Sequence, residues 1–95
     1  MRTRLTDLII HGHSGPWQQA AYWLRRLTNH DPAGPFAAVW SDLAGHPRRA
    51  VRHRVATQLA GVHRDVADPL IARLLTDRSD LVRRFARQAA ARSAG

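Results

Sequence analysis

The 95-residue sequence contains no cysteine, no lysine and no glutamate. Without cysteine, the chain has no disulfide, no thiolate metal site and no thiol nucleophile. That absence fits a reducing cytoplasm, which is where we expect the protein. The chain also has no stretch approaching the roughly 20 consecutive apolar residues that a membrane-spanning helix needs. We therefore expect neither a membrane segment nor a signal peptide.

Charge is the most unusual property of the composition. The absence of both lysine and glutamate is typical of GC-rich coding, which explains why arginine replaces lysine. It does not explain the formal net charge of +8, because the same bias replaces glutamate by aspartate. A strongly basic chain attracts anionic surfaces, so the excess of arginine indicates an acidic partner.

Length and apolar content predict one small domain spanning residues 1–95. Hydrophobic residues make up 44% of the chain and charged residues 23%, which is ordinary for a globular protein. A domain of this size buries only about 60–70% of the surface that its unfolded chain exposes. We expect a thin core.

Turn-forming residues divide the chain into six helix-length segments, and apolar side chains recur at helical spacing in each one. Pro16, Pro35, Pro47 and Pro69 stand where helices are expected to begin, because proline is tolerated in the first helical turn. No segment alternates apolar and polar residues as a strand does. The pattern predicts an all-α fold with helical hairpins at about residues 3–29, 35–61 and 66–93.

The chain repeats itself at an offset of 31 residues, which places residues 36–61 on residues 67–92 without a gap. Few positions are identical, but Val51 falls on Val82, Arg52 falls on Arg83, and most other pairs match in character. The first hairpin aligns more weakly. The offset predicts that the second and third hairpins are copies of one structural unit.

Residues 77–90 read DRSDLVRRFARQAA, with an acidic turn, a Val-Arg pair and small residues at helical spacing. This segment resembles the second helix of a HEAT-like repeat, and residues 46–56 are a weaker copy. Over residues 36–92 the chain is similar to the short HEAT-like repeats of phycobilisome-lyase-type proteins. The resemblance implies a right-handed α-solenoid of about three helical hairpins. It carries no lyase activity over, because no cysteine or bilin-site pattern is matched.

The same resemblance offers a second role for two arginines. In HEAT-like families the arginine after valine often joins its helix to the acidic turn of a neighbouring hairpin. Arg52 and Arg83 occupy that position, so a structural role competes with a binding role for both.

The sequence does not support catalysis. His11, His13, His30 and Asp31 are of metal-binding types, but they stand among turn-forming residues and match no known zinc-site spacing. Ser14 follows no strand and lacks the spacing of a nucleophile elbow. We expect a protein that is not an enzyme, with no metal and no cofactor.

The candidate binding residues are arginines. Arg48 and Arg49 fall in the first turn of the fourth helix, where the helix dipole disfavours cations and favours an anion. Helical spacing places Arg49, Arg52 and His53 on the outward side of that helix. Arg83, Arg84 and Arg87 occupy the same side of the sixth helix. Stacked hairpins would join the two sets into one basic stripe.

Two kinds of partner suit such a stripe. We favour docking on an acidic protein surface, because repeat proteins offer extended faces built from neighbouring units. The alternative is sequence-nonspecific nucleic-acid binding through phosphate contacts, with Tyr22 or Trp23 as candidate aromatic contacts that stack on a base. The apolar flanks of the first and last helices also offer surfaces for pairing with another copy.

Overall fold

The computed structural model describes residues 2–94, and the side chains of residues 4–92. Met1 and Gly95, the ends of the predicted domain, lie outside the described residues. Within residues 2–94 there are six α-helices, one short 3-10 helix and no strand, which confirms the predicted all-helical class. The elements are α1 (Arg2–His11), α2 (Ser14–His30), α3 (Phe36–Ala44), α4 (Arg49–Gln58), η1 (Leu59–Gly61), α5 (Arg64–Leu74) and α6 (Asp80–Ala94). None of these helices is both long and apolar enough to cross a membrane.

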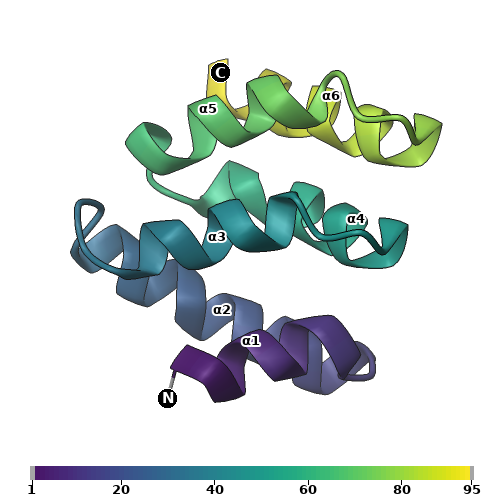
Figure 1. Cartoon of the computed structure of the whole chain (residues 1–95). Coiled ribbons are helices and arrows are strands. Elements are labelled where there is room, and N and C mark those ends of the chain that lie inside the picture. Colours follow the sequence, from purple (N-terminus) through teal and green to yellow (C-terminus); the bar gives the residue numbers. More distant parts are fainter. Residues whose placement is uncertain (1, 95) are drawn as a thin grey trace.

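The helices lie in three levels, each made of two consecutive helices (Figure 1). The first level holds α1 and α2, the second α3 and α4, and the third α5 and α6. Between levels, α3 contacts both α1 and α5, and α4 packs on α6. By contrast, α2 packs mainly on α1 and α3. α4 thus packs on the level that follows it, whereas α2 packs mainly on its own partner helix and on α3.

One apolar core receives side chains from all six helices. Its largest fully buried members include Trp40, Leu24, Leu43 and Leu74, which come from three levels. α3 has only 9 residues and α4 only 10, so neither would be a stable helix alone. The apolar faces must pack together for the helices to persist.

A short chain of buried hydrogen bonds joins the first level to the second. The indole Nε1 of Trp40 donates to the Thr28 hydroxyl at 2.8 Å, and that hydroxyl donates to the Leu24 carbonyl at 2.6 Å. Trp40 and Thr28 are both 0% exposed. A buried indole N–H needs a partner, so Thr28 makes the central tryptophan compatible with the core.

Two arginines of the second level satisfy the end of α1. The Arg54 guanidinium donates to the Ile9 carbonyl at 2.8 Å and lies 5.0 Å from the centre of the Trp17 ring. Arg48 reaches the Ile10 carbonyl at 3.5 Å. The last carbonyls of a helix lack intrahelical partners and carry partial negative charge. Both arginines therefore connect the second level to the first; Arg54 is half-buried and Arg48 is exposed.

The predicted start of the fifth helix at Pro69 is wrong. α5 begins at Arg64 and contains Pro69. The imidazole of His63 accepts a hydrogen bond from the Asp65 amide at 3.2 Å, and this side-chain cap allows the earlier start. Val66 and Ala67 are buried in the added turn. Their burial outweighs the hydrogen bond that proline removes.

We predict that Thr28→Val lowers the free energy of unfolding by about 1–3 kcal/mol, because the Trp40 N–H loses its buried acceptor. Thr28→Ser keeps the hydroxyl and should cost clearly less. Urea unfolding followed by circular dichroism measures both variants. Equal losses would show that the hydroxyl contributes nothing beyond filling space.

Candidate functional site: an arginine hollow between α4 and α6

The charge of the protein is unevenly divided between the first and second helices of the three levels. The second helices, α2, α4 and α6, carry nine arginines and one aspartate. The first helices, α1, α3 and α5, carry four of each, and the connections carry two of each. The whole net charge of +8 therefore belongs to the second helices.

One of these arginines, Arg52, is buried and has a structural role. Arg52 is 4% exposed, and its Nε and Nη2 donate to the two carboxylate oxygens of Asp77 at 2.8 and 3.2 Å. Its Nη1 donates to the carbonyls of His46 and Pro47, both at 2.9 Å. Arg52 thus joins the α3–α4 turn to the α5–α6 turn with a bidentate, charge-assisted pair.

The two turns repeat each other in their hydrogen bonds. The side chain of His46 accepts from the backbone amide two residues later, and Asp77, 31 residues further on, does the same for Ser79. Arg52 donates to the carbonyl six residues before it, and so does Arg83. The 31-residue offset found in the sequence is therefore visible in the bonding of the second and third levels.

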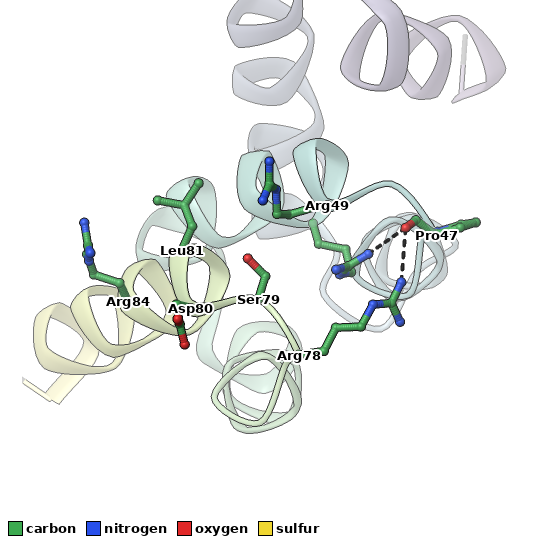
Figure 2. Close-up of a pocket in the computed structure, with 8 residues that line it drawn as sticks. Pro47, Arg49, Arg78, Ser79, Asp80, Leu81 and Arg84 are labelled. Carbon is green, nitrogen blue, oxygen red and sulfur yellow. Dashed lines mark hydrogen bonds between the residues drawn. The ribbon is translucent and has the colours of Figure 1, made fainter.

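An open hollow of about 560 Å³ lies between the N-terminal ends of α4 and α6. We call it the arginine hollow; its lining is Pro47, Arg49, Arg52, Arg78, Ser79, Asp80, Leu81 and Arg84. In Figure 2, Arg49 and Arg84 project on either side of Leu81. Arg78 reaches the Pro47 carbonyl at 3.3 Å. Four arginines thus line one open space.

The backbone adds positive potential to the hollow. The first turn of α4 has no acidic residue, and its N-cap, Arg48, makes no side-chain capping bond. α6 is capped by Ser79, whose hydroxyl accepts from the Val82 amide at 3.4 Å. Amides at both helix starts favour an anion. The one carboxylate in the lining, Asp80, is paired with Arg83 on its own helix.

The predicted arginines fall into two groups. Arg49 and Arg84 are exposed and line the hollow together, as the stripe required. Arg87 is exposed on α6 but lies outside the lining. Of the two roles expected for Arg52, the structure confirms the structural one, because its guanidinium is buried against Asp77 in the turn of the next hairpin. Arg52 therefore does not point outward as the stripe required. Arg83 is half-buried and bonded to Asp77 and Asp80.

His53 does not extend the basic surface as expected. Its ring meets Phe85 edge to face, with centroids 4.5 Å apart, and its Nε2 is buried without a hydrogen-bond partner. Burial, and then the charges of Arg54 and Arg49, lower the pKa of His53 below its ordinary value. Its surroundings therefore disfavour the charged imidazole, and the ring packs beside Phe85.

Tyr22 and Trp23 are exposed on α2, at 39% and 47%. Their rings meet edge to face at 5.5 Å, and Arg26 lies over both. Arg26 also donates to the Tyr22 hydroxyl at 3.0 Å. The predicted aromatic contacts are thus accessible and held together, but neither residue lines the arginine hollow.

Sequence reasoning missed Arg78. Arg78 stands in the α5–α6 turn, and its place in the hollow depends on how close that turn lies to Pro47. The turn at residues 77–80, DRSD, could have indicated this position, because Arg78 directly follows Asp77. Arg48, a predicted anion-binding residue, is exposed, and its guanidinium reaches the Ile10 carbonyl at the end of α1 at 3.5 Å.

Within the described residues, no three histidine or aspartate side chains gather as a metal site would require. The titratable groups at the hollow are arginines and one paired aspartate. Such a set binds and orients an anion through charge-assisted hydrogen bonds.

Comparison with known proteins finds no matching family model, no matching curated protein and no matching solved structure.

The pH dependence of stability tests the Arg52–Asp77 pair. Burial by itself raises the pKa of Asp77, but hydrogen bonds from Arg52 and Ser79, with the charges of Arg52 and Arg78, hold it below its ordinary value. The stability from this lowered pKa is complete above the unfolded value of about 3.9 and is lost as pH falls through the folded value.

We predict that Asp77→Asn costs about 3 kcal/mol of unfolding free energy at pH 7, because the Arg52 charge stays buried without its partner. The difference from the parent protein should narrow below about pH 4. Asp68→Asn is the control, since that half-exposed carboxylate pairs with Arg64 at 3.6 Å and should change stability by about 1 kcal/mol or less. If the difference in unfolding free energy between Asp77→Asn and the parent protein did not change with pH, the Arg52–Asp77 pair would not be the source of this stability.

Proposed function

We propose that this protein is a non-enzymatic adaptor module, a short HEAT-like solenoid that docks on an acidic protein segment through the arginine hollow. The observation that carries the proposal is the concentration of the whole net charge on α2, α4 and α6. A reducing cytoplasm remains the expected location. The second and third levels support the repeat, since their turns and arginines bond alike.

The hollow suits carboxylates. Arg49 and Arg84 are exposed beside Leu81 and Pro47, so an acidic side chain next to an apolar one finds both a charge and an apolar contact. The molecule already contains such recognition in its own Arg52–Asp77 pair. Guanidinium groups match the planar carboxylate with two parallel hydrogen bonds.

We predict that Arg49→Gln/Arg84→Gln weakens binding of a fluorescein-labelled peptide of alternating Glu and Leu by at least about tenfold. Fluorescence anisotropy at fixed ionic strength measures the affinity. The matched control is Arg4→Gln/Arg64→Gln, which removes the same charge from exposed positions on α1 and α5. Equal losses in both double variants would mean that only net charge matters, and the hollow would have no special role.

Nucleic-acid binding is the second candidate, and the exposed Tyr22, Trp23 and Arg26 favour it because single strands use aromatic platforms beside cations. Its test is a salt titration with a 15-nucleotide oligothymidine and a random DNA duplex. Nucleic-acid binding predicts a steep fall of affinity with salt and a further loss in Trp23→Ala. Tighter binding of oligothymidine than of the acidic peptide at 150 mM salt would overturn protein docking.

A further inference from the structure

One face of α4 is covered by the next level. Arg52 and Ala56 of α4, and Leu59, which begins η1 directly after it, are 4%, 1% and 0% exposed. Arg52 is covered through its pair with Asp77. Ala56 faces Phe85 and Ala89 of α6 across a narrow cavity of about 230 Å³. η1, which begins at Leu59, contacts α6.

The 31-residue equivalents of these positions form a row on α6, namely Arg83, Arg87 and Ala90. We call it the outer row of α6. Phe85 faces α4 across the cavity, and each arginine of the row stands two residues from it. Two residues correspond to about 200° around a helix. The row therefore lies on the side of α6 opposite α4.

Burial agrees with this placement. Arg83 and Ala90 are half-buried and Arg87 is exposed, whereas the equivalent residues of the second level, Arg52, Ala56 and Leu59, are all buried. Within residues 2–94 the row is thus accessible in the place where α4 is covered by a helix.

The chemistry of the row differs from its α4 equivalent at one decisive position. Ala56 is replaced by Arg87, so an apolar helix laid on the row would bury an unpaired charge. Arg83 holds its own turn through the Asp77 carbonyl, as Arg52 holds the His46 carbonyl. Arg52 pairs with Asp77, a carboxylate of the next level. Arg83 pairs instead with Asp80 of its own helix, and the Asp80 side chain is 90% exposed.

We propose that the outer row of α6 is a docking face for an acidic α-helix, which packs on α6 as α6 packs on α4. Carboxylates one helical turn apart pair with Arg83 and Arg87, and a small or apolar side chain rests on Ala90. On binding, a carboxylate of the partner helix replaces Asp80 as the ion-pair partner of Arg83. It would then pair with Arg83 as Asp77 pairs with Arg52. This inference rests on the proposed function, and it specifies the secondary structure of the partner.

The row and the hollow are neighbours, because Arg83 of the row precedes Arg84 of the hollow on α6. One acidic partner therefore reaches both. The hollow accepts carboxylates in any backbone conformation, whereas the row requires carboxylates at helical spacing. The two surfaces therefore differ in whether the ligand must be helical.

The test uses two fluorescein-labelled 18-residue peptides with the same composition and charge. Both carry glutamates at i, i+4 spacing among alanines, and one has two central alanines in the D configuration, which breaks the helix. We expect the all-L peptide to bind the intact protein at least about tenfold more tightly. In Arg87→Gln this preference should disappear, while the D-alanine peptide keeps its affinity.

Arg64→Gln is the matched control, because it removes one exposed arginine from α5 and should leave the preference intact. Arg87 is exposed and makes no bond to the fold among those described, so loss of folding does not obscure its effect. Arg83→Gln is measured second, after circular dichroism has shown that the variant is folded.

Three results overturn the inference. If both peptides bind equally and both lose affinity in Arg49→Gln/Arg84→Gln, the hollow stands and the row does not. If the helical preference survives Arg87→Gln, the helix docks elsewhere. If neither peptide binds, the proposed function falls together with the inference.

Discussion

The buried pair of Arg52 and Asp77 is the interaction on which the other features depend. It joins the α3–α4 turn to the α5–α6 turn, and by doing so it sets α6 on α4. The arginine hollow exists because these two turns lie side by side, and α6 presents its outer row because α4 covers the opposite side. One guanidinium, bonded to two carbonyls and one carboxylate, thus positions both surfaces.

Much of this architecture is predictable from the sequence because helix formation and apolar periodicity are local. The 31-residue offset even matches Arg52 with Arg83, whose bonds to their own turns are alike. Local sequence patterns gave wrong predictions where contacts between levels determine the structure. The start of α5 depends on the burial of Val66 and Ala67, which outweighed the proline signal.

The same limit applies to the candidate site. Helical spacing placed Arg49 and Arg84 on one surface, but it assigned Arg52 and His53 to that surface as well. Whether an arginine faces solvent depends on the partner that another level supplies, here Asp77 for Arg52 and the end of α1 for Arg54. Arginine abundance alone therefore overestimates the binding surface, because several guanidinium groups join neighbouring levels.

The separation of a neutral set of helices from a basic set gives the molecule a permanent electric dipole moment. A polyanion near such a molecule would exert a torque on the dipole and would turn the basic helices toward itself before any contact formed. Productive collisions then become more frequent than random orientation allows. Added electrolyte would weaken this orientation, so ionic strength would change the rate of encounter with an anion as well as the affinity for it.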